Sequence, residues 1–289
     1  MTDPLELACE GLRCQIEPAL GGCIRGLWLN DVPVLRPPPT EPLTSARAAG
    51  CYPLVPFSNR IAHATLKWQG TSHPLIQNNG AEPHAIHGVG WQAAWTLLDR
   101  DDQFAMLSFE HRRSNAWPFA FDASQTLRVR PGVLELTLSI TNQSGVAAPA
   151  GLGWHPFFVK RHRSHMVFKA AGRWEMGKDK LPTRRGDSQG LDTDCAGLSV
   201  DHCFDGWDGV VELRDELLCT RVISNLRHLV VFTHAARDSV AIEPVSHVNN
   251  AINLIGSSSG AAADALGVRV LQAGESMTAQ MSIHTEPAK

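Results

Sequence analysis

The feature that most constrains the fold is a pair of adjacent segments, 123–131 and 133–145, with the periodicity of β-strands. In the second segment polar or small positions alternate with Leu134, Leu136, Leu138 and Ile140. An alternation with period two predicts a strand that buries one face. Pro131 and Gly132 separate the two segments and favour a tight turn. The sequence therefore predicts an antiparallel hairpin at the centre of the chain.

The rest of the chain repeats this pattern of short apolar runs separated by turn residues. Further strands are expected at 5–9, 12–18, 23–29, 91–99, 103–111, 217–225, 228–234 and 239–244, with a final hairpin over 268–285 that turns at Ala273-Gly274. Residues 160–200 predict loops and short strands, 246–254 a loop with one helical turn, and 257–267 a flexible or weakly helical surface piece. No long helical pattern, sustained heptad or internal repeat emerges. We predict an all-β chain with few short helices, a large antiparallel β-sandwich that forms a single domain over residues 1–289.

Composition and charge narrow the classes of function. Apolar residues make up 43% and charged residues 19%, and the formal net charge is −3 with scattered arginines, which argues against a nucleic-acid partner. No run of 18 apolar residues and no basic segment followed by an apolar one is present, so we expect a cytoplasmic protein that does not engage a membrane. The seven cysteines show no CxxC spacing, and we expect them to be reduced and buried.

The densest polar segment of the sequence is 51–91. It contains Asn59 and Arg60 after an apolar run, Asn78 and Asn79 before Gly80, and His84 and His87 before Gly88. Buried hydrogen-bonding groups without partners cost about 1–3 kcal/mol each. We therefore expect this segment to line a polar cleft rather than to form core.

Three polar residues stand where apolar or turn residues are expected. His155 interrupts the apolar run 148–158, Glu243 ends the apolar strand 239–244, and His87 precedes the turn at 88–90. Taken singly, a buried histidine is more often a core residue and a glutamate at a strand end is more often solvated. Together with Arg60 and Asp201 they form a set from which an acid, a base and hydroxyl-binding groups can be assigned.

Other chemistries lack their sequence signatures. The histidines at 84 and 87 do not form HExxH, and no HxH pair or nearby cysteine completes a zinc or manganese site, which argues against a metal. The serines at 257–259 lie in an expected surface loop with no strand leading into it, which argues against a nucleophilic serine, and no GxxxxGK[ST] or GxGxxG is present. The acid–base set is therefore the candidate chemistry that the residues themselves favour.

Five motifs in order, YPLVPFSNRIA, QNNGAEPHAIHGVGW, GLGWHPFF, VDHCFDGWDG and AIEPVSHVNNAIN, resemble the aldose 1-epimerases, or galactose mutarotases. The resemblance covers nearly the whole chain. It implies a galactose mutarotase-like supersandwich whose concave face binds a free hexose or pentose with no cofactor. By the same resemblance, Glu243 is the catalytic base and His155 the acid.

The resemblance also assigns residues that bind the sugar. His87, Arg60 and Asp201 match substrate-binding positions, and Asn59 supports them. Asp205 is an alternative to Asp201 because both lie in one short motif. Asn79 stands where family members often carry another residue, so the resemblance gives it no role.

Mutarotation requires removing the proton from O1 of a cyclic sugar and delivering one to the ring oxygen O5. At pH 7 a glutamate is an ionised base, and a histidine is partly protonated, with neighbouring carboxylates favouring the imidazolium. We therefore expect Glu243 to be charged and His155 to carry the proton. Trp91, Trp154 and Trp207 stand beside the motifs and are either sugar-stacking residues or large core residues.

Two alternatives remain open from the sequence. A hexose-6-phosphate epimerase on the same fold needs basic residues for the phosphate, and Arg112 with Arg113, or Arg161 with Arg163, are candidates. A non-catalytic carbohydrate-binding module needs no acid–base pair, so the presence of both Glu243 and His155 argues against it. The sequence specifies neither the preferred aldose nor the oligomeric state.

Overall fold

The computed structural model describes residues 4–39, 42–255 and 266–289. The described chain is built from β-strands, and every pairing between named strands is antiparallel, as predicted. The helices of the described ranges are short: η1 (Ala46–Ala48), η2 (Ala62–Ala64), η3 (Gly90–Gln92) and α1 (Ala251–Ile255). None of them is long and apolar enough to span a membrane.

The largest sheet has nine strands. Their spatial order is β10 (Thr96–Arg100), β11 (Phe104–His111), β12 (Phe121–Arg130), β13 (Val133–Asn142), β27 (Ser276–Pro287), β23 (Leu218–Ser224), β22 (Val210–Arg214), β17 (His165–Phe168) and β20 (Leu191–Asp194). The hairpin predicted from the alternating segment is confirmed: β12 and β13 pair from Arg130 with Val133 outward, around the turn at Pro131-Gly132. Leu134, Leu136 and Leu138 are at most 2% exposed, so the apolar positions of the alternation face the core.

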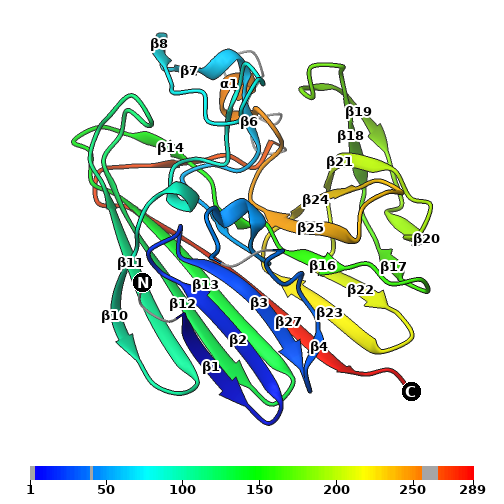
Figure 1. Ribbon diagram of the computed structural model, residues 1–289. Coiled ribbons are helices and arrows are strands. Elements are labelled where there is room, and N and C mark those ends of the chain that lie inside the picture. The colour runs from blue at the N-terminus through cyan, green and yellow to red at the C-terminus, as the bar shows by residue number, and fades with distance from the viewer. Residues whose placement is uncertain (1–3, 40–41, 256–265) are drawn as a thin grey trace.

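A second sheet of eight strands carries the candidate site. Its order is β19 (Pro182–Asp187), β18 (Gly172–Met176), β21 (Val200–Asp205), β24 (His228–Thr233), β25 (Ser239–Val245), β15 (Gly153–Trp154) and β5 (Pro53–Leu54), with β16 (Phe157–Val159) also paired to β25. Of these strands, β16, β18, β19, β21, β24 and β25 are labelled in the right-hand half of Figure 1. The four short strands within 160–200, β17 to β20, agree with the predicted mixture of loops and short strands.

Smaller sheets complete the fold. A four-stranded meander of β1 (Leu5–Cys9), β2 (Leu12–Glu17), β3 (Cys23–Leu29) and β4 (Val32–Pro33) packs against β12 and lies in front of the nine-stranded sheet in Figure 1. The three two-stranded pairs are β14 (Ala148–Ala150) with β26 (Arg269–Leu271), β6 (Arg60–Ile61) with β9 (Ala85–Ile86), and β7 (Thr65–Trp68) with β8 (Thr71–Pro74).

One hydrophobic cluster joins the sheets into a sandwich. It contains Leu127 and Leu134 of the nine-stranded sheet and Leu229 and Ile242 of the eight-stranded sheet, all of them with no exposed surface. Burying an aliphatic side chain of this size stabilises the fold by about 1.5–3 kcal/mol. The all-β sandwich expected from the sequence is therefore confirmed.

Some local predictions were wrong. Segment 268–285 is not a hairpin, because β27 is paired on both sides, with β13 and with β23, and β26 pairs with β14 instead. The segment expected as a strand from residue 91 begins with the turn of η3, and its strand starts at Thr96. The predicted helical turn in 246–254 is present as α1. The surface piece predicted over 257–267 lies mostly outside the described residues.

The cysteines largely follow the prediction. All seven are free thiols, and five of them are buried, while Cys9 and Cys219 are half-buried. Burial raises the pKa of the thiols of Cys14 and Cys203 well above the ordinary value, so they remain protonated and behave as small apolar residues.

Candidate active site

The register of the eight-stranded sheet brings His155 and Glu243 together. β15 and β16 both pair with β25, with Gly153 opposite Val245 and Phe157 opposite Ala241. The same register places His155 opposite Glu243, on the same face of the sheet, because opposite residues of antiparallel strands share a face. The Nε2 atom of His155 lies 3.1 Å from Oε1 of Glu243. Two residues 88 positions apart thus form a direct contact.

Aromatic rings enclose His155. The ring of Tyr52 stacks on it with the ring centroids 4.8 Å apart, and the centroid of the Phe157 ring lies 4.3 Å from that of His155. Loss of hydration disfavours the imidazolium, and this burial, reinforced by the charges of nearby arginines, lowers the pKa of His155 to about 3. The expectation that neighbouring carboxylates favour the imidazolium is therefore wrong for the free pocket, because desolvation outweighs them.

Glu243 is also forced toward its neutral form. Its side chain is 3% exposed. Burial, with the negative charge of Asp201 as the second cause, raises the pKa of Glu243 well above the ordinary value. Its Oε2 atom has no hydrogen-bond partner among the described residues. The expectation of a charged Glu243 is thus wrong for the free pocket as well, and one proton is shared between two buried, nominally neutral groups.

The polar segment 51–91 forms the wall above this pair. Asn59 and His87 both have left-handed backbone conformations, with φ of 55° and 62°, which cost energy in residues other than glycine. They are held by mutual bonds: the backbone N–H of His87 donates to the carbonyl of Asn59 at 2.8 Å, and the N–H of Asn59 donates to Nδ1 of His87 at 3.1 Å. Because Nδ1 accepts, the proton of the neutral ring is on Nε2. Burial lowers the pKa of His87 well below the ordinary value, so this ring remains neutral.

Arg60 is oriented by a carboxylate that sequence reasoning did not single out. Its guanidinium donates to both oxygens of Glu82, at 2.9 and 3.2 Å, and its Nη1 donates to Oδ1 of Asn59 at 3.2 Å. Lys180 also donates to Glu82. Partial burial opposes ionisation, but the hydrogen bonds from Arg60 and Lys180 bring the pKa of Glu82 to about 2. The bidentate geometry fixes the plane of the Arg60 guanidinium.

The structure separates the two aspartates that the sequence left as alternatives. Asp201 lines the pocket. Asp205 does not; its carboxylate accepts hydrogen bonds from Nε and Nη2 of Arg185, at 2.8 and 2.7 Å, and from Nε1 of Trp174 at 2.8 Å. Asp205 therefore joins β18, β19 and β21, and of the two aspartates Asp201 is the one that lines the pocket.

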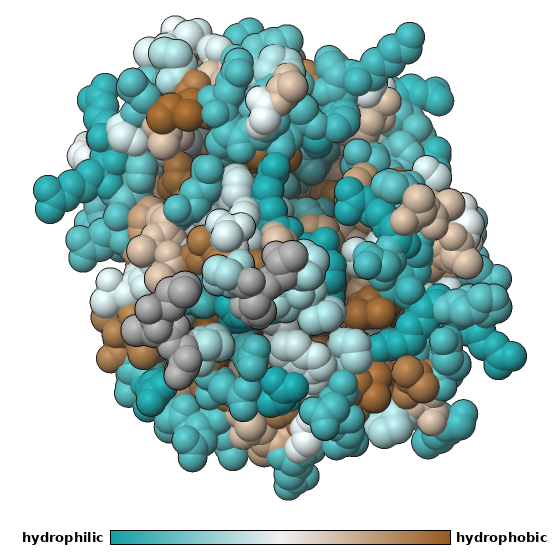
Figure 2. Space-filling view, viewed as in Figure 1, coloured by the Kyte–Doolittle hydropathy of each residue, from teal (hydrophilic) through white to brown (hydrophobic). Residues whose placement is uncertain are grey.

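All six residues selected from the sequence line one pocket of about 290 Å³: Asn59, Arg60, His87, His155, Asp201 and Glu243. The hollow in the upper half of Figure 2 is in the region between β6 and the β18–β19 hairpin, over β24 and β25. Asn79, to which the resemblance gave no role, also lines it. The volume is at the small end of ligand sites, which suits a monosaccharide.

Other residues of the pocket wall were missed. Tyr52, Glu82, Lys180 and three arginines, Arg36, Arg47 and Arg237, line the pocket. Tyr52 and Glu82 fall inside motifs quoted for the resemblance and could have been found there. Arg36, Arg237 and Lys180 come from loops and Arg47 from the short helix η1, none of which has a periodic pattern in the sequence.

Several residues considered from the sequence do not line the pocket. Trp154 and Trp207 are at most 1% exposed and belong to the core, and Trp91 is buried against Tyr52. Arg161 donates to Asp215 at 2.7 Å, and Arg112, Arg113 and Arg163 are also absent from the pocket wall. Within the described ranges, no group of three or more His, Cys, Asp or Glu side chains is arranged to hold a metal ion.

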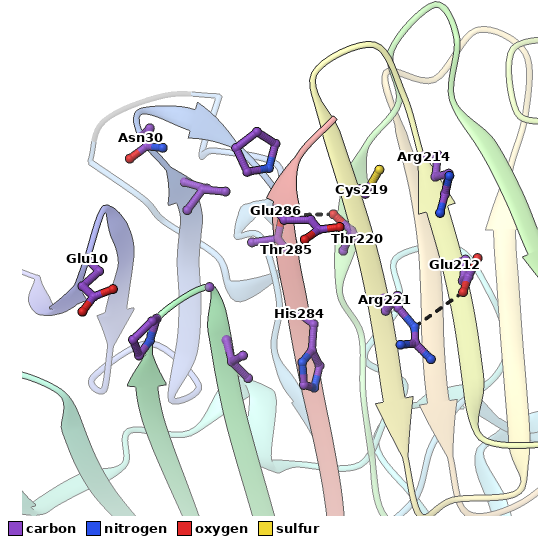
Figure 3. Close-up of a pocket in the computed structure, with 15 residues that line it drawn as sticks. Glu10, Asn30, Glu212, Arg214, Cys219, Thr220, Arg221, His284, Thr285 and Glu286 are labelled. Atoms are coloured by element: carbon purple, nitrogen blue, oxygen red, sulfur yellow. Dashed lines mark hydrogen bonds and ion pairs between the residues drawn. The ribbon is translucent and has the colours of Figure 1, made fainter. Parts of the chain in front are cut away.

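A larger hollow of about 560 Å³ lies elsewhere, along β22, β23 and β27 (Figure 3). Its Glu212 pairs with Arg221 at 3.5 Å, and both side chains are about half exposed. His284 in this hollow bonds to the hydroxyl of Ser282 at 2.9 Å and makes no ion pair with a carboxylate of the described residues. The hollow has no buried proton-transfer pair, so the smaller pocket is the candidate active site.

Comparison with known proteins identifies the family of the chain. A sequence model of the family described as aldose 1-epimerase matches residues 8–284. The chain belongs to the aldose 1-epimerase family. Members of this family act on sugars.

Two uncharacterized proteins of Escherichia coli K12 are relatives of the chain in sequence. The chain is 35% identical over 154 residues to the uncharacterized protein YphB of Escherichia coli K12, an alignment that spans 53% of this chain and about half of YphB, at 51%. It is 26% identical to YihR of the same organism over 69% of this chain and 70% of YihR.

Solved structures resemble the whole chain. An Escherichia coli K12 protein provisionally assigned as an aldose 1-epimerase superposes with a TM-score of 0.88 at 26% identity, covering 99% of both chains. A galactose mutarotase-like protein from Clostridium acetobutylicum superposes with a TM-score of 0.84 at 18% identity, covering 99% of this chain and 95% of that one. The second likeness concerns the fold alone.

Proposed function

We propose that the protein is a mutarotase that interconverts the α and β anomers of an aldose by acid–base ring opening and closure. The observation that carries this proposal is the contact of 3.1 Å between the buried side chains of His155 and Glu243 at a pocket of monosaccharide size. Ring opening needs one group to accept the O1 proton while another delivers a proton to O5. A pair that holds one transferable proton meets this need.

The proton count of the pair explains how one site serves both halves of the reaction. With Glu243 ionised and His155 protonated, Glu243 takes the proton from O1 and His155 gives its proton to O5. Opening therefore leaves Glu243 protonated and His155 neutral. After rotation about C1–C2, the reverse transfers close the ring to the other anomer. No covalent intermediate is required.

In the free pocket, Glu243 and His155 have the same protonation states as after ring opening. Burial favours a protonated Glu243 and a neutral His155, as their pKa shifts indicate. Catalysis from the cyclic sugar then begins with transfer of the proton from Glu243 to His155. Sugar hydroxyls that donate to the carboxylate, including its unpartnered Oε2, stabilise the resulting charge.

The remaining pocket residues hold the sugar. We assign Nε2–H of His87 and the guanidinium of Arg60 as donors, and Asp201 as an acceptor, with Asn59 positioning both donors through its contacts with them. Fixed donors and acceptors hold O1 and O5 against the proton-transfer pair. A non-catalytic binding module has no use for a buried acid–base pair, whose desolvation is costly.

The test is the rate of anomer interconversion in Glu243→Gln and His155→Asn. Each proton-transfer group contributes about 10²–10⁴ in rate, so both variants should lose at least about 100-fold in kcat/KM, measured by polarimetry. Glu110→Gln and His162→Asn, at exposed positions, are matched controls that should keep the rate. A loss of less than about threefold in both site variants would overturn the assignment.

A further inference from the structure

The charges of the pocket wall are unevenly distributed. The wall contains five cationic residues and three carboxyl groups: Arg36, Arg47, Arg60, Lys180 and Arg237 against Glu82, Asp201 and Glu243. Arg60 and Lys180 are already paired with Glu82. Because burial keeps Glu243 protonated, three arginines remain against the single charge of Asp201.

These three arginines make no ion pair with any described carboxylate. Nη2 of Arg36 donates to the backbone carbonyls of Arg47 and Ala49, at 2.7 and 2.8 Å, and its guanidinium lies 3.8 Å from the ring centroid of Phe157. Asp238 is close enough to act on Arg36 electrostatically but does not bond to it. Arg36 is therefore fixed in place without an ion pair to a described carboxylate.

Arg47 and Arg237 are held by aromatic rings. The guanidinium of Arg47 lies 5.0 Å from the centroid of Trp91, and that of Arg237 lies 4.5 Å from the centroid of Phe232. The Nε atom of Arg237 is buried and has no hydrogen-bond partner among the described residues. Stacking on a ring face fixes a guanidinium and leaves its edge free to donate. Both side chains are therefore oriented but retain free donors.

The three arginines gather at one end of the pocket. Arg36 lies on the ring of Phe157, whose centroid is 4.3 Å from that of His155, and the charges of all three arginines act on His155. The charges that act on Glu243 are those of Asp201 and Arg60. The pocket thus has a basic end beside His155 and a balanced end beside Glu243.

The proposed reaction relates this polarity to the sugar. His155 delivers its proton to the ring oxygen O5, and O5 is bonded to C5, which carries the exocyclic C6 group in an aldohexopyranose. The substituent at C6 is thus directed to the side of His155, where the arginines lie. A neutral CH₂OH group would leave this cluster of cations without a counter-charge, at an electrostatic cost.

We propose that Arg47 and Arg237, supported by the charge of Arg36, form an oxyanion subsite, and that the preferred substrate is an aldose with a carboxylate or phosphate at C6. This inference rests on the proposed mutarotase function and specifies its substrate class. Guanidinium groups suit either oxyanion because their planar donors match two oxygens at once. The arginines that the sequence offered for a phosphate take no part.

The experiment compares D-glucose, D-glucuronate and D-glucose 6-phosphate as substrates, with anomer exchange followed by NMR. The charged sugar that fits should exceed glucose in kcat/KM at least tenfold, and the ratio of glucuronate to the phosphate identifies the oxyanion. Arg47→Gln and Arg237→Gln should each lower this preference for the charged sugar about tenfold or more, through KM, as expected for a lost hydrogen bond to a charged group.

Arg128→Gln is the matched control, because Arg128 also stacks on an aromatic ring, that of Phe104 at 4.6 Å, but lies outside the pocket. It should keep the preference. The subsite would be refuted if kcat/KM for glucose equalled that for both charged sugars, or if the arginine variants affected neutral and charged sugars equally. Either result would leave the mutarotase function unaffected.

A direct binding measurement tests the oxyanion subsite independently of the mutarotase function. Titration calorimetry of the Glu243→Gln variant should show that it binds the preferred charged sugar. The double variant that also carries Arg237→Gln should bind this sugar about tenfold more weakly or worse. Binding of this kind without turnover in the wild-type protein would support the subsite while refuting the mutarotase function. No measurable binding of either charged sugar would overturn the subsite.

Discussion

Replacing the two aspartates of the motif at 201–205 by asparagine should affect different properties. Asp205 accepts three hydrogen bonds, two from Arg185 and one from Trp174, and its side chain is 12% exposed. Hydrogen bonds to a charged group contribute about 1.5–3 kcal/mol each, but Arg185 is 38% exposed and solvent screens its share. Asp205→Asn should therefore lower the free energy of unfolding by about 2–3 kcal/mol and change kcat/KM little.

Asp201→Asn should show the opposite pattern. Asp201 lines the pocket and makes no ion pair among the described residues, so the free energy of unfolding should change by less than about 0.5 kcal/mol. Loss of one charged acceptor for a sugar hydroxyl corresponds to about 1.5–3 kcal/mol, or about 10–100-fold in kcat/KM. The charge that raises the pKa of Glu243 is also removed, so the alkaline limb of the pH profile should shift to lower pH.

Urea unfolding and polarimetry on the same preparations measure both properties. The reasoning would be refuted if Asp205→Asn lost activity as strongly as Asp201→Asn while retaining its stability, because Asp205 would then be the residue that contacts substrate.

Three further predictions follow from the buried groups and the core. Because the pKa of His155 is lowered to about 3, kcat/KM should stay level from pH 7 to pH 5, and an acid limb with its midpoint near 6.5 would contradict this. His247, with a pKa of about 4, gains its proton on unfolding below pH 6.5, so stability should fall by about 1.4 kcal/mol per pH unit on its account as pH drops toward 4, and His247→Gln should make the measured slope shallower by that amount. Since one hydrophobic cluster joins the nine- and eight-stranded sheets, we expect the chain to behave as one domain with a single calorimetric unfolding transition, and two separated transitions would show otherwise.

Local periodicity in the sequence predicted where strands lie better than it predicted which strands pair with one another. The alternation in 133–140 specified both the strand and its buried face because that information is contained in consecutive residues. The turn at Ala273-Gly274 is equally clear in the sequence, but it does not join a hairpin, since the edges of β27 are occupied by β13 and β23. Strand pairing depends on residues far away in the chain, which a local pattern does not contain.

The candidate site shows the same division. His155 and Glu243 stood out as polar residues in apolar strands, and the sheet register brings them into contact. Their protonation was not predictable, because it depends on the rings of Tyr52 and Phe157 and on burial that only the fold creates. The arginines at the basic end come from loops and from the three-residue helix η1, where no periodicity marks a residue that faces a pocket.

The most direct measurement of the central claim is polarimetry on freshly dissolved α-D-glucose and α-D-galactose, beside D-glucose 6-phosphate and D-glucuronate, with the wild-type protein and with Glu243→Gln. We predict faster decay to the equilibrium rotation for at least one of these sugars and at least about 100-fold less acceleration in the variant. Acceleration of none of the sugars, or equal acceleration by both proteins, would contradict an acid–base mutarotase built on His155 and Glu243.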